Sequence, residues 1–346
     1  MGLIRMWPFM WNRRRRMMIE QDVKRFLAEW NDEKDSVLVH TSGSTGQPKS
    51  LWVEKRRMLT SARITCDFLG LKEGDTALLC LSPDYIAGKM MVVRALERGL
   101  RLICVEPDGH PLKHITEHGE ITFVAMVPMQ VYNSLQVPEE RKRLMGIKHL
   151  IIGGGAIDDD LAQALKDFPH AVWSTYGMTE TLSHIALRRL SGNEASDHYM
   201  PFDGVEVSVN ADHCLVIHAP QVCPHPLVTN DLAELAPDGR RFRIIGRKDN
   251  VICSGGIKIQ IEEMERLLTP YIPVPFMVTK VKDEKFGEAV VLLSCNSSAP
   301  LKEICQSVLP PFWCPRYFLT VDSLPTTETG KPARRKAEEL AMNMLK

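Results

Sequence analysis

The segment best suited to chemistry directly follows an apolar run at residues 37–40. Its glycines let the backbone approach a ligand, and its hydroxyls and lysine supply hydrogen-bond donors and a positive charge. This combination predicts a loop that binds a phosphate chain, with a flexible Ser/Gly turn as the alternative. It is not a Walker A loop, because Pro48 precedes Lys49 and the motif lacks a terminal Gly-Lys-Ser/Thr. The segment is Thr41-Ser42-Gly43-Ser44-Thr45-Gly46-Gln47-Pro48-Lys49.

Six further segments with glycine or charged residues follow in order along the chain. Taken singly, each is explained by a tight turn or a solvated loop. Together they offer an aromatic ring, a carboxylate that can accept hydrogen bonds, a carboxylate for a hard cation and a late lysine. They are Gly153-Gly154-Gly155-Ala156, Tyr176-Gly177-Met178-Thr179-Glu180, Thr229-Asn230-Asp231, Gly246-Arg247-Lys248-Asp249, Ser254-Gly255-Gly256 and the loop 325–331, which ends in Lys331.

In this order the segments resemble the signatures of the acyl-adenylate-forming superfamily, which includes acyl-CoA synthetases, luciferases and peptide-synthetase adenylation domains. Within it, the chain is most similar to the compact bacterial o-succinylbenzoate–CoA ligases of menaquinone biosynthesis. The resemblance implies an enzyme that adenylates a carboxylic acid with ATP and releases pyrophosphate. It then transfers the acyl group to CoA and releases AMP. Mg²⁺ is the implied cofactor, and ATP and CoA are the implied co-substrates.

The resemblance also assigns a role to each segment. The reaction brings a carboxylate to the anionic α-phosphate, so charge must be neutralised and the groups held in line. Lys331 is the implied catalytic residue, Glu180 the metal ligand and Asp249 the hinge between domains. The ATP phosphates would be bound by Thr41, Ser42, Gly43, Ser44, Thr45, Gly46 and Lys49. The adenine and ribose would be bound by Gly154, Gly155, Ala156, Tyr176, Gly177, Met178, Thr179, Asp231 and Arg247. CoA would be bound by Ser254, Gly255 and Gly256.

For the acid, the resemblance points to Tyr85, Ser183 and His184 as pocket residues, although His184 is equally explained as core packing. Two departures stand out: Asn230 replaces the glycine of the ribose motif, and only forty residues precede the phosphate loop. Relatives carry an extra N-terminal subdomain there, so part of the usual pocket wall and subunit interface is expected to be absent or supplied differently. Three rivals stay open: a ligase for another aromatic or branched acid, an adenylate-former for a carrier protein, and a degenerate nucleotide-binding regulator.

The hydrophobic pattern indicates which elements position these residues. Short apolar runs alternate with helical patterns up to about residue 176, which predicts a mostly parallel sheet in an α/β fold. Short strands with turns predict a β-rich subdomain after about residue 200. The runs read as buried strands are 37–40, 76–81, 101–106, 149–154 and 171–176; the helix candidates are 58–69, 86–98 and 158–168.

The domain boundaries follow from these patterns and from the order of the motifs. We expect an N-terminal extension (1–36), an AMP-binding domain (37–248) and a small, mobile α+β cap domain (249–346). The polar run 246–256 is interpreted as the linker. Three cations after the lysine loop are interpreted as a solvated helix face: Arg334, Arg335 and Lys336.

Composition narrows the remaining classes of function. The 346 residues carry 43 Lys+Arg and 43 Asp+Glu, so the net charge of zero provides no field for nucleic acid. The nine cysteines form no CxxC pair, which suits a reducing cytosol and a cytoplasmic location. Arg5 and Pro8 interrupt the first apolar run, so neither a signal peptide nor stable membrane insertion is expected. The partners expected are a small carboxylic acid, ATP and CoA, and a homo-oligomer is left open.

Overall fold

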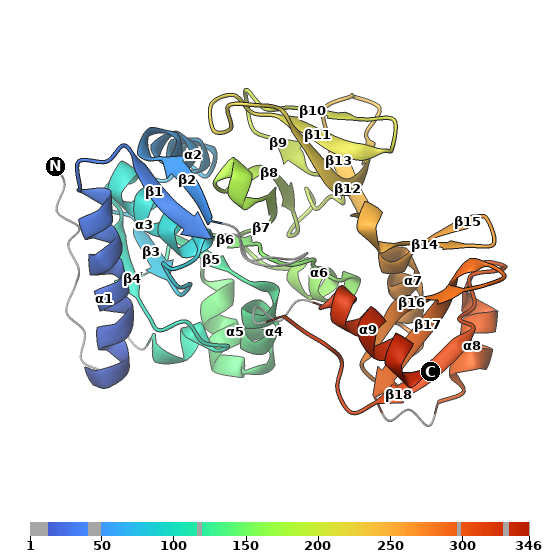
Figure 1. Cartoon of the computed structure of the whole chain (residues 1–346). Helices are drawn as coiled ribbons and strands as arrows, with labels where there is room; N and C mark the ends of the chain where they lie inside the picture. Colours follow the sequence, from blue (N-terminus) through green and yellow to red (C-terminus); the bar gives the residue numbers. More distant parts are fainter. Residues whose placement is uncertain (1–12, 41–49, 116–119, 296–298, 328–331, 346) are drawn as a thin grey trace.

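The computed structural model describes residues 13–40, 50–115, 120–295, 299–327 and 332–345, and the structural statements below refer to these ranges. Figure 1 shows three parts: a helix-covered sheet at the N-terminal end, a small β-rich sheet, and a C-terminal body with its own sheet and helices. The predicted phosphate loop (41–49) and Lys331 lie outside the described residues.

The largest sheet has seven strands in the order β4-β3-β5-β6-β7-β8-β9. The first five pair in parallel, and β8 and β9 pair antiparallel at one edge. The predicted, mostly parallel sheet is therefore confirmed. Its bounds are β3 Thr76–Leu79, β4 Arg101–Cys104, β5 Phe123–Met126, β6 His149–Ile152, β7 Ala171–Gly177, β8 His184–Arg189 and β9 Met200–Pro201.

The strand β5 was not among the predicted strands, although it lies in the interior of this sheet, between β3 and β6. All four of its residues are buried. A short strand buried on both faces loses the polar–apolar alternation that reveals a half-buried strand. Strand β3 is buried in the same way and was predicted from its apolar run, so burial alone does not explain why β5 was missed.

Helices cover both faces of the sheet. Successive residues of β3 face opposite sides: Leu79 joins the core cluster under α1, α2 and α3, whereas Leu78 joins the cluster under α4, α5 and α6. This two-sided burial explains why β3 and β5 are buried along their whole length. The bounds are α1 Arg13–Trp30, α2 Lys55–Phe68, α3 Ile86–Arg98, α4 Pro128–Gln136, α5 Pro138–Met145 and α6 Asp159–Leu165, with short 3₁₀ turns η1 Pro111–His114 and η2 Thr179–Thr181.

The run 37–40 forms a strand, but its predicted place in the parallel sheet is wrong. Strand β1 (Ser36–His40) pairs antiparallel with β2 (Ser50–Glu54), and His40 lies opposite Ser50. The predicted phosphate loop therefore connects the two strands of a hairpin. The apolar run indicated a strand but carried no information about its partner.

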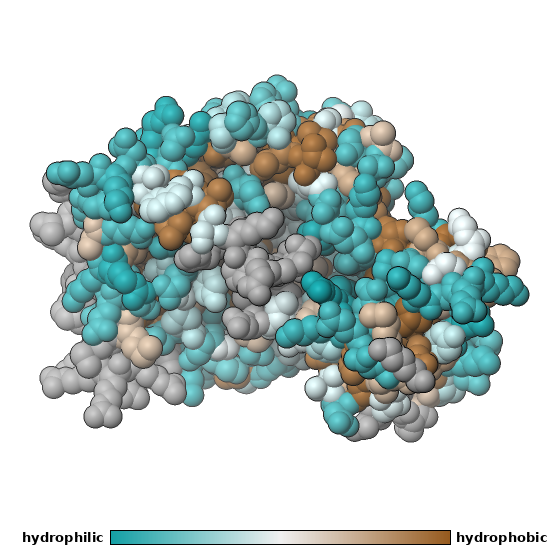
Figure 2. All heavy atoms as spheres, viewed as in Figure 1, coloured by the Kyte–Doolittle hydropathy of each residue, from teal (hydrophilic) through white to brown (hydrophobic). Residues whose placement is uncertain are grey.

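The β-rich part is a four-stranded antiparallel sheet in the order β10-β11-β12-β13, above the larger sheet in Figure 1. Strand β12 brings Asp231 opposite Arg247 of β13. Figure 2 shows a mostly hydrophilic face with small apolar patches, one of them in this region. The bounds are β10 Glu206–Val209, β11 Cys214–His218, β12 Leu227–Leu235 and β13 Phe242–Arg247.

The C-terminal body contains a five-stranded sheet in which β15, β14, β17 and β16 are neighbours and β18 pairs in parallel with β17. Helices α7 and α8 pack with one face and α9 with the other. The elements are β14 Val251–Ser254, β15 Ile257–Gln260, α7 Ile261–Leu268, β16 Phe276–Asp283, β17 Gly287–Cys295, α8 Leu301–Val308, β18 Tyr317–Val321 and α9 Arg334–Met344, preceded by the turn η3 Lys248–Asn250.

The run 246–256, interpreted as a linker, contains η3 and β14. One expectation about this region is wrong. Arg334 does not belong to a solvated helix face: its guanidinium binds both carboxylate oxygens of Glu265 at 2.5 Å and lies 3.2 Å from the Val278 carbonyl. Sequence alone could not reveal this partner, which lies 69 residues away.

The N-terminal helix α1 is part of the packed structure. Its residues Ile19, Val23 and Phe26 are at most 2% exposed and belong to the core cluster under α2 and α3. Among the described helices, none is both long and apolar enough to span a membrane.

Candidate active site

The predicted adenine-binding segments lie at one edge of the large sheet. Strands β6 and β7 are parallel neighbours, so the glycine loop after β6 and the segment at the end of β7 leave the sheet side by side. Ligands of open α/β sheets bind at this carboxyl edge. A Cβ on Gly153 would lie 2.3 Å from Thr175 Oγ1, and a Cβ on Gly177 would lie 2.3 Å from the Ser183 carbonyl oxygen. Glycine is therefore required where each segment passes its neighbour.

Tyr176, Asp231 and Arg247 meet although they come from three strands. The Tyr176 hydroxyl donates to Asp231 Oδ2 at 2.6 Å, and Arg247 Nη1 donates to Asp231 Oδ1 at 3.2 Å. Burial and the adjacent Asp231 carboxylate raise the pKa of Tyr176, so the hydroxyl stays protonated and can only donate to that carboxylate. The predicted adenine and ribose residues thus form one hydrogen-bonded group.

The predicted hinge residue also contacts the ribose segment. Asp249 Oδ2 accepts from Asn230 Nδ2 at 3.1 Å and from Arg247 Nη2 at 3.3 Å. Asn230 stands where the superfamily carries glycine, and its side chain supplies a contact that glycine cannot make. Arg247 binds the predicted ribose and hinge carboxylates at once.

Glu180, the predicted metal ligand, is exposed in η2 immediately after β7. Within the described ranges, no group of three or more His, Cys, Asp or Glu residues could hold a metal by itself. A hard carboxylate oxygen fits Mg²⁺, which usually takes one or two protein carboxylates together with substrate phosphates and water.

The predicted pocket residues Ser183 and His184 belong to a buried polar group. His184 is 7% exposed; its Nε2 lies 3.1 Å from Thr65 Oγ1, and its Nδ1 lies 3.2 Å from Ser183 Oγ. Burial, and then the positive charge of Arg94, lower the pKa of His184 well below its usual value. His184 is therefore neutral and packed, with both ring nitrogens in contact.

Arg94 is the main member of this group that the sequence did not reveal. It lies in the third turn of α3, is 2% exposed, and donates to Ser183 Oγ at 2.6 Å. Its Nε has no hydrogen-bond partner, and among the described residues no carboxylate forms an ion pair with it or influences its pKa. Burial lowers the pKa of Arg94 to about 10, so its guanidinium is charged at neutral pH. In the sequence, this buried cation is indicated by an arginine within an apolar helical run.

Tyr85, the remaining predicted pocket residue, caps the N-terminus of the same helix and is 44% exposed. It lies about 14 Å along the helix axis from Arg94, at 1.5 Å per residue. The helix α3 therefore carries a pocket candidate at its start and a buried cation near its end.

The predicted CoA segment forms the turn between β14 and β15. The Gly255 N–H donates to the Phe286 carbonyl at 2.9 Å, and a Cβ on Gly255 would lie 3.1 Å from the Phe286 ring. Arg316 stacks over the same ring, with its guanidinium 5.3 Å from the ring centroid. The turn thus lies beside an aromatic face and a cation, which suit a base and a phosphate.

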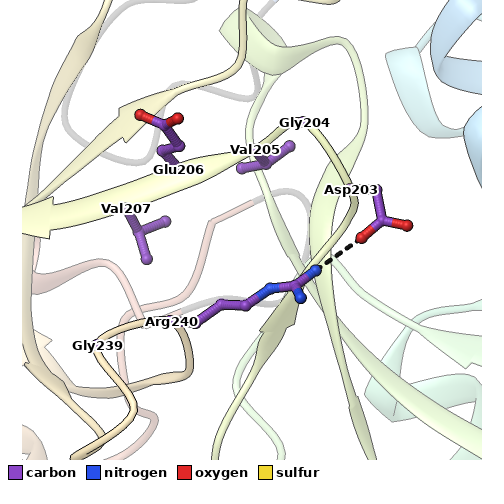
Figure 3. Close-up of a pocket in the computed structure, with 7 residues that line it drawn as sticks. All are labelled: Asp203, Gly204, Val205, Glu206, Val207, Gly239 and Arg240. Atoms are coloured by element: carbon purple, nitrogen blue, oxygen red, sulfur yellow. Dashed lines mark hydrogen bonds and ion pairs between the residues drawn. The ribbon is translucent and has the colours of Figure 1, made fainter.

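Two shallow surface hollows lie elsewhere. One, of about 540 Å³, is drawn in Figure 3, where Arg240 reaches across to Asp203 at 2.7 Å. The other, of about 450 Å³, includes Asp159 of α6 and Arg266 of α7, whose charges lie 3.8 Å apart. None of the predicted site residues lines either hollow.

Comparison with known proteins decides the family. The family model described as AMP-binding enzyme matches residues 11–216, more than half of the chain. The chain belongs to the AMP-binding enzyme family. A solved Dyadobacter fermentans structure described as an acyl-CoA synthetase (AMP-forming)/AMP-acid ligase II-like protein is 33% identical. That match covers 94% of this chain and 95% of the other, with a TM-score of 0.64.

Other relatives of this AMP-binding enzyme are more distant. A 2–succinylbenzoate–CoA ligase from Listeria monocytogenes is 24% identical, over 93% of this chain and 74% of its own length. The o-succinylbenzoate CoA synthetase of Bacillus subtilis, solved with its acyl-adenylate intermediate, is 22% identical with a TM-score of 0.74 and shares the fold. That match covers 87% of this chain and 68% of the other. The predicted superfamily, the α/β fold class and the enzyme class, an AMP-forming acid–thiol ligase, are confirmed.

Proposed function

We propose that this AMP-binding enzyme adenylates o-succinylbenzoate with ATP and then transfers the acyl group to CoA. The names of its curated relatives support this substrate. One structural observation carries the proposal: the buried Arg94 guanidinium lies beside Ser183 without a carboxylate partner in the described chain.

The substrate explains this uncompensated charge. o-Succinylbenzoate has two carboxylates, and whichever one reacts, the other must be held away from ATP. A buried charge is unfavourable unless it is paired, and arginine binds a carboxylate through two parallel hydrogen bonds. The second carboxylate of the substrate would supply the partner that Arg94 lacks, and Ser183 Oγ lies close enough to take part.

In the first half-reaction, a carboxylate oxygen of the acid attacks the α-phosphorus of ATP, and the bond to the β-phosphate breaks to release pyrophosphate. The loop 41–49 would hold the β- and γ-phosphates, Tyr176 the adenine and Asp231 the ribose hydroxyls. Lys331 would stabilise the charge that develops between the carboxylate and the α-phosphate. Mg²⁺, held by Glu180 and phosphate oxygens, supplies further charge neutralisation when bound.

In the second half-reaction, the CoA thiolate attacks the acyl carbon and the bond to AMP breaks. No protein nucleophile is required, so none of the nine cysteines is assigned a catalytic role. Ser254, Gly255 and Gly256 would meet CoA, with the Phe286 ring and Arg316 beside them. The cap domain (249–346) would rotate about Asp249 between the two steps.

A test compares o-succinylbenzoate with 4-oxo-4-phenylbutanoate, which lacks the ring carboxylate. Acid-dependent pyrophosphate release should be at least tenfold more efficient, in kcat/KM, with the two-carboxylate acid. The Arg94→Gln variant should abolish most of this preference and change the efficiency with the one-carboxylate acid less than threefold. Equal efficiencies for both acids in the wild-type enzyme would reject the substrate assignment.

The same assay separates the rival functions. Pyrophosphate release that occurs with other aromatic or branched acids but not with o-succinylbenzoate would indicate another substrate. Acid-dependent release without consumption of CoA would favour a carrier-protein acceptor. No acid-dependent release across the panel would favour a nucleotide-binding regulator.

A further inference from the structure

Lys89 is a second buried cation on α3, and the N-terminal helix compensates its charge. Its side chain is only 9% exposed, and its Nζ lies 3.6 Å from Glu29 Oε2 and 4.7 Å from the centroid of the Phe26 ring. Both partners belong to α1. A buried ammonium requires such partners, because an unpaired charge inside the protein destabilises the fold.

Glu29 also binds a third element. Its Oε1 accepts a 3.1 Å hydrogen bond from the backbone N–H of Leu38 in β1. A single carboxylate therefore joins α1, the helix α3 and the strand that leads into residues 41–49.

The other side of α3 carries Arg94, which contacts Ser183, a predicted pocket residue. Lys89 and Arg94 are five residues apart, which places them about 140° apart around the helix. Arg94 reaches Ser183 on its side, whereas Lys89 reaches α1 on the other. The helix also has no free space at its start, because a Cβ on Gly88 would lie 2.2 Å from the Ser82 carbonyl oxygen. A change in the support from α1 must therefore move α3 as a unit.

We propose that Glu29 is a positioning residue for acid binding: by pairing with Lys89 from α1, it fixes α3 and hence the place of Arg94 beside Ser183. This inference rests on the proposed function for its catalytic consequence, but the coupling across α3 does not require a substrate.

The informative variant is Glu29→Gln. Its amide oxygen can still accept from the Leu38 N–H, so the change removes only the charge that faces Lys89. We expect the KM for o-succinylbenzoate to rise at least fivefold, while the KM for ATP changes less than twofold. Adding Lys89→Met should return the acid KM to within twofold of the wild-type value, because no unpaired charge remains and methionine packs against Phe26.

The matched control is Arg25→Gln. Arg25 also links α1 to the segment before α3, through Asp84 at 2.7 Å, but both side chains are at least 60% exposed. Exposed pairs contribute little, so neither KM should change. If Glu29→Gln lowers the melting temperature but leaves the acid KM unchanged, or raises both KM values equally, Glu29 has a general structural role and the proposal is wrong.

Hydrogen exchange gives a readout without any substrate. Glu29→Gln should speed amide exchange in residues 86–94 and also in 182–187, which contains Ser183, the residue that Arg94 contacts. Lys89→Met should reverse both effects. Faster exchange confined to α1 and the start of α3 would overturn the coupling. An inactive wild-type enzyme would contradict the proposed function alone, since the exchange result still decides this inference.

Discussion

Tyr176 donates a 2.6 Å hydrogen bond to Asp231, which links the carboxyl edge of the large sheet to the β-rich sheet. The two residues are 55 positions apart, and each belongs to a separate predicted nucleotide-binding segment. Arg247 binds the same carboxylate from the neighbouring strand. The acceptor expected for the ribose is thus held in place from two directions, as a preorganised site requires.

The Tyr176→Phe variant tests the importance of this bond. The ring remains, so a surface for adenine is kept, but Asp231 loses one of its two donors. We expect the KM for ATP to rise roughly fivefold, which corresponds to about 1 kcal/mol for a partly exposed hydrogen bond to a charged group. Steady-state kinetics with varied ATP would measure this. An unchanged KM for ATP would show that Arg247 alone orients Asp231.

The Lys331→Ala variant tests the predicted division between half-reactions. Adenylation, measured as pyrophosphate release, should fall at least a hundredfold, because the lysine charge is used only while the α-phosphate is attacked. Thioester formation from supplied acyl-adenylate should fall less than fivefold. Gly256→Val is the reciprocal control and should impair the second step more than the first. Equal losses in both steps for Lys331→Ala would refute its assignment.

The Arg334→Ala variant tests the corrected placement of this residue. Glu265 would lose its bidentate partner while staying largely buried, so the free energy of unfolding of the C-terminal body should fall by about 2 to 3 kcal/mol. Urea denaturation would measure the loss. Arg335→Ala is the matched control: Arg335 pairs with Glu339 at 3.1 Å but is 84% exposed, so its loss should cost less than about 0.5 kcal/mol. Equal effects of the two changes would contradict the buried pair.

The buried His184 predicts a loss of stability in mild acid. Its pKa in the folded chain lies well below 6.5, because burial and then the charge of Arg94 disfavour the protonated ring. The unfolded chain takes up the proton below about pH 6.5 and the folded chain does not, so stability falls as the pH decreases through this value. Between pH 7.5 and 5.5 the loss from this residue should be about 1.4 kcal/mol. Urea unfolding would measure the free energy of unfolding of the wild-type and His184→Gln proteins at several pH values. This free energy should depend less on pH in the variant. The same pH dependence in both proteins would show that His184 does not cause the loss.

The sequence by itself determined the local elements and the order of the motifs. Apolar runs predicted β3, β4, β6 and β7, and helical spacing predicted α2 and α3, because these patterns depend only on which face of a short segment is buried. The family could be inferred in the same way, since its signatures are contiguous. Their roles at the site stay predictions.

Only the tertiary structure decided which distant residues became partners. It placed the run 37–40 in a hairpin with β2, and β5 between β3 and β6, because strand pairing depends on the whole fold. It also paired Arg334 with Glu265, Lys89 with Glu29, and Arg94 with Ser183. A charged residue looks the same in sequence whether it is solvated or buried. Its surroundings, and therefore its chemistry, are set by segments that meet only when the chain folds.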